Sequence, residues 1–282
     1  MKIVSTISEA REAVKSARSA GKTIGLVPTM GSLHEGHLSL VRASKSACGF
    51  TAASIFVNPT QFNSSEDYNT YPRDAGRDLE LLDKEGVDMV FAPPFEEMYR
   101  EKTSAYIDIG KLSEIFEGKL RPGHFRGVCT VVCKLFNIIT PDRAYFGWKD
   151  AQQLIIIKKM VKALNMPVEV IGCPTVRESD GLAASSRNIF IAAGERERAL
   201  CLYKSLKKIE ELLLKQNIRD TAILLEEGRK IITKYPDVEL QYLEITDAEN
   251  LECIEEVKGR ALVLGAIKLS RVRLIDNLTL SF

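Results

Sequence analysis

The feature that most constrains this chain is the alternation of short apolar runs with helical segments over its first two thirds. Thr51–Val57 and Val87–Pro93 are apolar almost throughout, and similar runs occur at Thr23–Val27, Arg143–Gly147 and Val168–Cys173. Continuous apolar runs of this length indicate strands that are buried on both faces, which occur in parallel sheets covered by helices. The chain is therefore predicted to be an α/β protein.

The pattern changes after about Pro174, where two long helical segments are followed by three strand-like runs. Helices followed by strands predict a separate, smaller α+β domain, in which the three strands form an antiparallel group. We therefore expect two domains, residues 1–175 and residues 176–282.

Composition excludes several classes of protein. Of 282 residues, 45% are hydrophobic, and 39 Lys and Arg balance 38 Asp and Glu. This balance predicts no nucleic-acid partner and no membrane surface, and no apolar run approaches the roughly 20 residues that span a bilayer.

The N-terminal segment lacks a signal-peptide core, and its pattern predicts a short strand and a helix opened by Ser8. Cys129 and Cys133 favour buried packing over half a metal site. A cytoplasmic protein is the simplest expectation.

The stretch PTMGSLHEGH, Pro28–His37, follows a buried strand and precedes a helix. Ligands of parallel sheets bind at the carboxyl ends of the strands, and a helix start suits phosphate. Gly31 and Gly36 allow close approach of the backbone, and His34 and His37 can donate to phosphate oxygens. Phosphate binding is favoured, while a metal site and an unliganded loop remain as alternatives.

Two further stretches suit a nucleotide. Ser185, Ser186 and Arg187 place two hydroxyls and a guanidinium in one loop, which could hold a polyphosphate or could be a solvated interdomain loop. In FGWKDAQQL, Lys149 suits a phosphate, and Asp150 suits a ribose hydroxyl or an N-cap. One of the two glutamines that follow, at positions 152 and 153, should point toward the cleft.

Two other stretches suit a smaller substrate. In FVNPTQF, Asn58, Thr60 and Gln61 are uncharged hydrogen-bonding groups at a strand end, which suit a small polar substrate. In RPGHFRGV, His124 and two arginines precede a helix, and they could bind an anionic substrate or form a structural arginine pair.

Together these stretches resemble the pantothenate synthetase (pantoate–β-alanine ligase) family of the HIGH-type nucleotidyltransferase superfamily. PTMGSLHEGH is similar to the family's form of the HIGH signature, and SSRN to its counterpart of the KMSKS loop. FVNPTQF, Tyr71–Arg73, RPGHFRGV and FGWKDAQQL occur in the family's order. The resemblance covers nearly the whole chain.

The resemblance implies a Rossmann-like, doubly wound N-terminal domain that binds nucleotide and pantoate, and a C-terminal domain that contributes the SSRN loop. It implies that ATP and pantoate form a pantoyl adenylate and pyrophosphate, and that β-alanine then displaces AMP to give pantothenate. Mg²⁺ would accompany ATP, and the protein would be a homodimer.

Residue roles are also carried over from the resemblance. His37 would be the catalytic proton donor, Gln61 and Gln153 would hold pantoate, and Gln61 would border the β-alanine position. Ala184 departs from the longer side chain of many relatives. The residues expected to bind ATP are Met30, Gly31, Ser32, Leu33, His34, Glu35, Gly36, His37, Gly147, Trp148, Lys149, Asp150, Val176, Ala184, Ser185, Ser186 and Arg187. The sequence does not identify the protein ligands of Mg²⁺.

The sequence leaves three other hypotheses open: a nucleotidyltransferase of the same superfamily with another acceptor, a nucleotide-binding sensor without turnover, and a zinc hydrolase.

Overall fold

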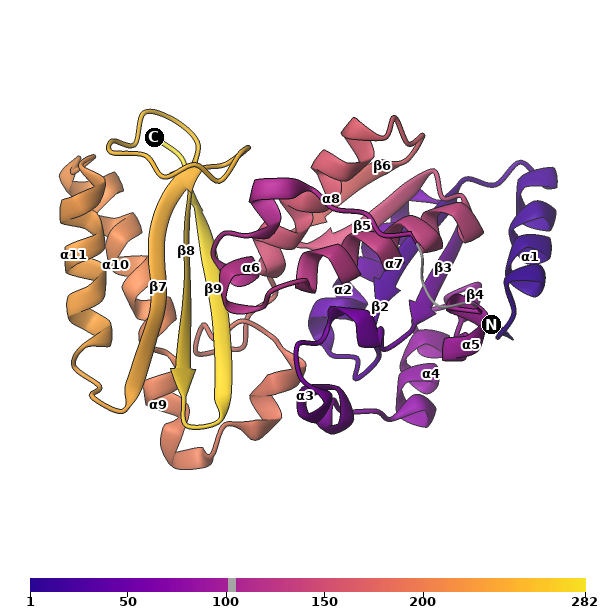
Figure 1. Ribbon diagram of the computed structural model, residues 1–282, viewed down its shortest axis with the longest axis horizontal. Helices are drawn as coiled ribbons and strands as arrows, with labels where there is room; N and C mark the ends of the chain where they lie inside the picture. The colour runs from indigo at the N-terminus through magenta and orange to yellow at the C-terminus, as the bar shows by residue number, and fades with distance from the viewer. Residues whose placement is uncertain (101–104) are drawn as a thin grey trace. The chain divides into compact units, whose positions relative to one another are not determined.

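The computed structural model describes residues 1–100 and 105–282, and the chain divides into two compact units. Unit 1 comprises Met1–Trp148 and Gln152–Pro174, and unit 2 comprises Lys149–Ala151 and Thr175–Phe282 (Figure 1). The sequence places the domain boundary after residue 175 and assigns 149–151 to the first domain, whereas the structure groups these three residues and Thr175 with unit 2.

Unit 1 is built on a six-stranded sheet with the order β1-β4-β3-β2-β5-β6, and all its strand pairs are parallel. The predicted parallel sheet is confirmed. Its strands are β1 (Lys2–Val4), β2 (Ile24–Thr29), β3 (Phe50–Ile55), β4 (Met89–Phe91), β5 (Arg143–Gly147) and β6 (Glu169–Cys173).

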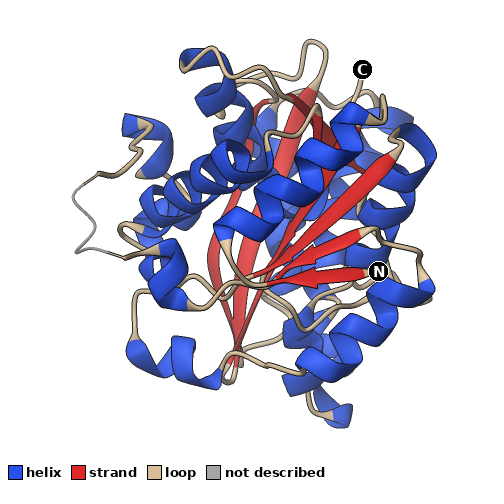
Figure 2. Ribbon diagram, turned by 90° about the vertical axis from the view of Figure 1, so that its right-hand side faces the viewer, coloured by secondary structure: helices blue, strands red, loops and turns tan. Residues whose placement is uncertain are grey.

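Helices cover both faces of this sheet (Figure 2). In β2, Ile24 and Leu26 belong to one apolar cluster, with residues of α1, α7 and α8, and Val27 belongs to another, with residues of α2 and α4. This alternation explains why the strands are apolar at successive positions. The helices are α1 (Ile7–Ser19), α2 (Glu35–Ala47), α3 (Ser65–Thr70), α4 (Ala75–Lys84), α5 (Phe95–Met98), α6 (Glu117–Leu120), α7 (His124–Ile139) and α8 (Ala151–Ala163), with short 3₁₀ turns η1 (Pro59–Gln61), η2 (Gly110–Ser113) and η3 (Trp148–Asp150).

The start of α1 differs from the prediction that Ser8 opens it. Thr6 is the N-cap: its side chain accepts from the backbone N–H of Glu9 at 3.2 Å, and the Glu9 carboxylate accepts from the backbone N–H of Thr6 at 3.1 Å. This reciprocal capping box outcompetes Ser8 because it satisfies two N–H groups of the helix start at once.

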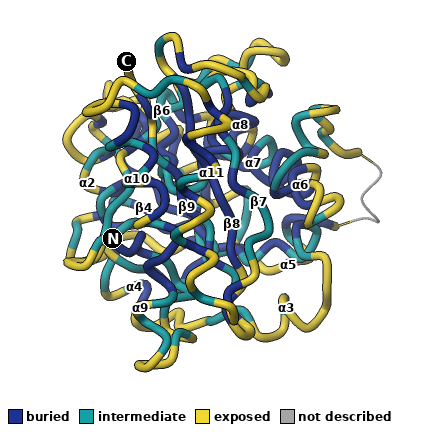
Figure 3. The backbone as a smooth tube through the Cα atoms, turned by 90° about the vertical axis from the view of Figure 1, so that its left-hand side faces the viewer, coloured by how far each residue is buried: buried dark blue, intermediate teal, exposed yellow. Residues whose placement is uncertain are grey.

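Unit 2 contains an antiparallel sheet with the order β7-β8-β9, as expected for the α+β part of the chain. Its middle strand, β8, is buried over almost its whole length (Figure 3). Residues of α10 and α11 form one apolar cluster with this sheet. The elements are η4 (Ser186–Phe190), η5 (Ala193–Glu195), α9 (Arg196–Ala199), α10 (Cys201–Gln216), α11 (Thr221–Ile232), β7 (Val238–Asp247), β8 (Ala261–Leu269) and β9 (Val272–Leu280).

Among the helices of the described ranges, none combines the length and the apolar character needed to cross a bilayer.

Candidate active site

The loop after β2 has a backbone shape that a carboxylate fixes. Gly31 and Ser32 both have positive φ, +78° and +50°. The carboxylate of Asp78, which is 1% exposed on α4, accepts from the backbone N–H groups of Ser32 and Leu33, each at 2.7 Å. A charged acceptor on two consecutive amides makes strong hydrogen bonds, so α4 holds this loop in one conformation.

The two histidines of the loop cap α2. The Nδ1 atom of His34 accepts from the backbone N–H of Gly36 at 3.1 Å, and Nδ1 of His37 accepts from the backbone N–H of His34 at 3.4 Å. The two rings lie 4.1 Å apart, centroid to centroid. Because Nδ1 is an acceptor in each ring, the neutral imidazoles carry their hydrogen on Nε2. An Nε2–H group at a helix N-terminus is a suitable donor to a phosphate oxygen.

A metal site at His34 and His37 would need further ligands. No group of three or more His, Cys, Asp or Glu side chains that could hold a metal ion occurs within residues 1–100 and 105–282. The two histidines therefore act as helix-capping hydrogen-bonding groups in this structure, which agrees with the phosphate hypothesis and gives no support to a zinc centre.

Gln61 lies beside this loop, in the turn η1 that follows the neighbouring strand β3. Its side chain is 7% exposed, and its Nε2 is 3.0 Å from the sulfur of Met30. β2 and β3 pair directly, so the residues that follow them emerge at the same edge of the sheet. The structure thus brings together a predicted ATP-binding residue and a predicted pantoate-binding residue.

His124 and Arg121 support Gln61. The Nδ1 atom of His124 lies 2.8 Å from the carbonyl oxygen of Gln61, and its Nε2 lies 3.2 Å from Nη1 of Arg121. Since a carbonyl only accepts and a guanidinium only donates, His124 is the Nδ1–H tautomer. The other arginine of this motif, Arg126, lies over the ring of Tyr106, 4.8 Å from its centroid. These contacts agree with the structural interpretation of the motif.

The two predicted glutamines of α8 have different surroundings. The buried Gln152 side chain donates to the carbonyl oxygens of Leu112 and Ile115, at 3.0 and 2.9 Å, and accepts from the backbone N–H of Glu117 at 3.0 Å. Gln152 therefore fastens the segment that leads into α6. Gln153 is half-buried, and it is the glutamine that the sequence assigns to pantoate.

Trp148 belongs to the packing of unit 1. A Cβ atom at Gly172 on β6 would lie 2.7 Å from the indole Nε1, so the ring lies directly against the bare backbone of that strand. The Lys158 ammonium lies 5.6 Å from the ring centroid. Gly147, which ends β5 just before Trp148, is half-buried. The assignment of these two residues to ATP remains a prediction.

In unit 2, the predicted ATP-binding residues that follow β6 lie on one folded-back segment. The backbone N–H of Ala184 donates to the carbonyl of Val176 at 2.9 Å, which pairs the two residues. Ser185 then caps η4, where its hydroxyl accepts from the backbone N–H of Arg187 at 3.3 Å. Ser186, the first residue of η4, is half-buried.

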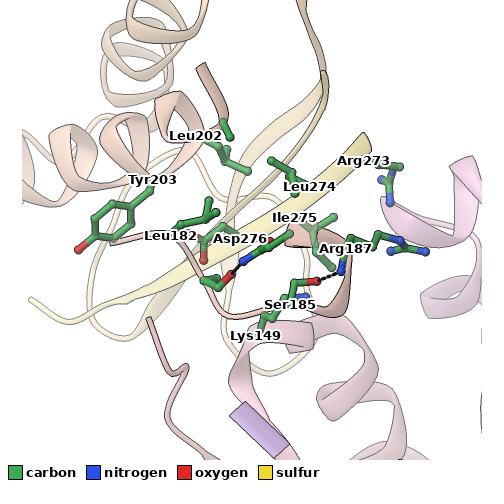
Figure 4. A pocket seen from close by; sticks show the side chains of 13 residues that line it. Lys149, Leu182, Ser185, Arg187, Leu202, Tyr203, Arg273, Leu274, Ile275 and Asp276 are labelled. Atoms are coloured by element: carbon green, nitrogen blue, oxygen red, sulfur yellow. Dashed lines mark hydrogen bonds between the residues drawn. The ribbon is translucent and has the colours of Figure 1, made fainter. Parts of the chain in front are cut away.

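A small cavity in unit 2 gathers several of these residues (Figure 4). Lys149, Ser185, Arg187 and Asp276 are among the residues that line it, and its volume of about 20 Å³ has room for about one water molecule. The backbone carbonyl of Lys149 accepts from Nδ2 of Asn277 at 2.9 Å. The lysine ammonium is 3.4 Å from the carboxylate of Asp150.

Three contributors to this geometry are not among the residues predicted from the sequence: Asp78, Tyr99, whose hydroxyl donates to Oδ1 of Asn58, and the ion pair Arg177–Asp276. Asp78 lies 46 residues from the loop that it holds, and Arg177 lies 99 residues from Asp276. No local pattern marks such a partner, because only the packing of the elements brings the groups together. The sequence offers one general signal: an Asp or Arg that becomes buried seldom lacks a partner, so a buried Asp or Arg implies a second group that binds it.

Comparisons with known proteins point to a single family. A family model described as pantoate-beta-alanine ligase matches residues 2–279. Curated proteins named pantothenate synthetase from Acetivibrio thermocellus and Thermotoga petrophila are 51% and 52% identical to this chain; each alignment covers 98% of it, and 98% and 99% of the relatives.

Two solved structures agree. A pantothenate synthetase from Thermus thermophilus superposes with a TM-score of 0.93 at 44% identity, covering 99% of both chains. A pantoate-beta-alanine ligase from Francisella tularensis, solved in complex with beta-gamma ATP and beta-alanine, superposes with a TM-score of 0.81 at 35% identity, covering 99% of this chain and 97% of the other.

Proposed function

Because this chain belongs to the pantoate–beta-alanine ligase family, we propose that it condenses pantoate with β-alanine at the expense of ATP. In the first step, the pantoate carboxylate attacks the α-phosphorus, and the bond to the pyrophosphate leaving group breaks. In the second step, the β-alanine amine attacks the acyl carbon of the pantoyl adenylate, and AMP leaves. The products are pantothenate, AMP and pyrophosphate.

The observation that carries this proposal is the contact between the helix-capping loop and Gln61. Nε2 of Gln61 lies 3.0 Å from the sulfur of Met30, at adjacent strand ends. A phosphate at the start of α2 and a carboxylate beside Gln61 would therefore be neighbours. Adenylation needs this alignment more than it needs covalent help from the protein.

The residues divide into three tasks. Gln61 and Gln153 orient pantoate, and Gln61 also borders the amine that attacks second. His37 donates a hydrogen bond from Nε2 to a phosphate oxygen of ATP, and His34, which lies beside it, has the same tautomer. Charge that develops on pyrophosphate is stabilised by cationic and hydroxyl groups. We assign the ATP contacts to Met30–His37, Gly147–Asp150, Val176 and Ala184–Arg187.

Mg²⁺ enters this proposal as part of the co-substrate MgATP. Within the described part of the chain, no cluster of three metal-binding side chains is present. Mg²⁺ commonly keeps several waters and binds through substrate phosphates with one or two carboxylates, so a preformed protein cage is not needed.

We further propose that the protein is a cytoplasmic homodimer. Its six cysteines are all free thiols, which suits a reducing compartment such as the cytoplasm.

The homodimer is tested by light scattering coupled to gel filtration, which gives the mass of the particle. A mass equal to that of a single chain, 31.4 kDa, would contradict the dimer.

The reaction is tested by following three products. With ATP and pantoate alone, the protein should release pyrophosphate and form an enzyme-bound adenylate, and pantothenate should appear only when β-alanine is added. A stable nucleotide adduct would instead indicate a transferase with another acceptor. No AMP formation by folded protein would reject the ligase.

The His37→Ala variant tests the catalytic assignment. We expect kcat to fall by about 10²- to 10⁴-fold, the range for loss of a positioned proton donor, while the Kd for ATP changes far less. Single-turnover kinetics and calorimetry measure the two quantities. Ser46→Ala, an exposed change at the other end of α2, serves as the control. Equal losses in kcat and in ATP affinity would show a binding or folding role for His37.

A further inference from the structure

The orientation of the buried Asn58 amide is determined twice by its neighbours. Asn58 is 1% exposed. Its Oδ1 lies 3.3 Å from the backbone nitrogen of Thr60, which can only donate, and its Nδ2 lies 3.1 Å from the carbonyl oxygen of Gly127, which can only accept. Exchanging the oxygen and nitrogen of the side chain would break both bonds, so a single orientation is possible.

Tyr99 reinforces this orientation. Its hydroxyl donates to Oδ1 of Asn58 at 2.9 Å, and the hydroxyl of Thr60 donates to the same oxygen at 2.9 Å. The Tyr99 ring is held independently by Phe95 and Phe56, with centroids 5.2 and 6.2 Å away. Burial raises the pKa of Tyr99 above its ordinary value of 10, so the hydroxyl keeps its proton at neutral pH.

The fixed Asn58 amide in turn fixes Gln61. Nδ2 of Asn58 donates to Oε1 of Gln61 at 3.1 Å, so the Gln61 oxygen faces inward and its NH₂ group faces the sulfur of Met30. The Gln61 backbone is held separately, because its carbonyl oxygen accepts from Nδ1 of His124 at 2.8 Å. A thioether is a weak acceptor, and a carboxylate or hydroxyl oxygen would be a much better partner for this NH₂ group.

We propose that Tyr99 and Asn58 are positioning residues that hold the Gln61 amide with its NH₂ group toward the substrate, so that Gln61 acts there as a hydrogen-bond donor. We call this chain of hydrogen bonds the relay, and all its bonds have the same direction. The Tyr99 hydroxyl donates to Asn58, Asn58 donates to Gln61, and Gln61 donates to an oxygen of the acid substrate. The identity of that acid as pantoate rests on the proposed function. Asn58 does not contact the substrate, because its amide is enclosed.

The Tyr99→Phe variant removes one hydroxyl and keeps the ring packing. One donor to Asn58 is lost, so the Gln61 amide is held less firmly. The KM for pantoate should rise by about 5- to 10-fold, as for the loss of one hydrogen bond, while the KM for ATP stays within about 2-fold.

Tyr145→Phe is the matched control for this variant. Tyr145 is also a buried tyrosine of unit 1, and its hydroxyl lies 3.4 Å from the sulfur of Cys48, within the other apolar cluster. It should leave both KM values unchanged. An equal rise of the KM for ATP and for pantoate in Tyr99→Phe, or a rise of the same size in Tyr145→Phe, would indicate a general packing effect and overturn the proposal.

Asn58→Asp reverses the direction of the relay. In its ionised form the introduced carboxylate can only accept, so the Gln61 amide turns its NH₂ group inward and presents its oxygen to the substrate, and the carbonyl of Gly127 loses its donor. Two acceptors would then face each other, and the KM for pantoate should rise more than in Tyr99→Phe, by about 10- to 100-fold. A smaller effect than that of Tyr99→Phe would contradict the relay.

A spectroscopic measurement tests the orientation without any substrate. In ¹⁵N-labelled protein, the Gln61 NH₂ signals are identified by their loss in Gln61→Glu. They should show a nuclear Overhauser effect to the methyl group of Met30, which weakens in Tyr99→Phe and persists in Tyr145→Phe. If pantoate is not a substrate, the proposed function fails while this measurement still decides the relay; no effect to Met30 in the unmodified protein would overturn the relay itself.

Discussion

At the scale of single residues, the loop that begins the candidate site depends on one glycine and one carboxylate. Gly31 has a φ of +78°, which side chains with a Cβ adopt at a cost. A Cβ atom there would also lie 2.8 Å from Oδ2 of Asp78, the atom that accepts from the backbone N–H of Ser32. Gly31 therefore provides the backbone conformation that the turn needs, and it leaves space for the Asp78 carboxylate that holds the turn.

Gly31→Ala and Gly21→Ala separate these two effects. Gly21 has a similar φ of +73°, and nothing lies within 4 Å of a Cβ placed there. Each change should cost about 1–2 kcal/mol of unfolding free energy through the backbone. Gly31→Ala should cost a further 1–3 kcal/mol, roughly the penalty of overpacking, and should also raise the KM for ATP. Urea denaturation and steady-state kinetics measure both; equal stability losses would show that Asp78 moves aside without strain.

At the scale of elements, a largely buried ion pair joins the segment that carries Ser185–Arg187 to β9. Arg177 binds Asp276 through two hydrogen bonds, at 2.7 and 2.9 Å, and also donates to the carbonyl of Gly181 at 3.0 Å. Its guanidinium lies 4.4 Å from the ring centroid of Tyr203. The side chains of Arg177 and Asp276 are only 18% and 6% exposed, so the two charges depend on each other.

Asp276→Asn should therefore lower the free energy of unfolding of unit 2 by about 3 kcal/mol, because it leaves the Arg177 charge buried without its partner. Asp237→Asn is the control, since Asp237 pairs with Arg198 where the side chains are 47% and 33% exposed; it should cost less than about 1 kcal/mol. Urea unfolding monitored by circular dichroism gives both values. Similar losses in the two variants would mean that burial adds nothing to the Arg177–Asp276 pair.

At the scale of the whole molecule, each unit has apolar clusters of its own. Two clusters lie in unit 1 and one lies in unit 2. Buried thiols report on each unit: burial raises the pKa of Cys129 in unit 1 to about 12 and that of Cys201 in unit 2 to about 11. A raised thiol pKa means that the neutral, unreactive form persists at pH 8 in the folded protein and that reactivity appears on unfolding.

Thiol alkylation across a urea series should therefore give separate midpoints for Cys129 and Cys201, one for the unfolding of each unit. Cys253, which is exposed, should react first and without urea. Peptide mass spectrometry after a short pulse of reagent at pH 8 measures each site. Coincident midpoints for Cys129 and Cys201 would show that the two units unfold as one cooperative body.

The sequence by itself determined the parallel sheet of unit 1, the antiparallel group of unit 2 and the family of the chain. Buried parallel strands are apolar along their whole length, and glycine, histidine and SSRN motifs occupy adjacent positions, so both signals are local. Their order along the chain was specific enough to indicate the family, which the comparisons then showed. The α1 cap was predicted wrongly, because Thr6 and Ser8 are both capping residues and the partner Glu9 decides between them.

Only the tertiary structure decided which side chains hold those loops. Asp78 reaches the loop from α4, Tyr99 orients Asn58 from 41 residues away, and Asp276 binds Arg177 from 99 residues away. The physical reason is that hydrogen-bond direction and burial depend on which groups face one another after the elements pack. The residue types form a local pattern that can be read along the sequence, whereas the partners that fix a side chain's orientation come together only in the folded protein.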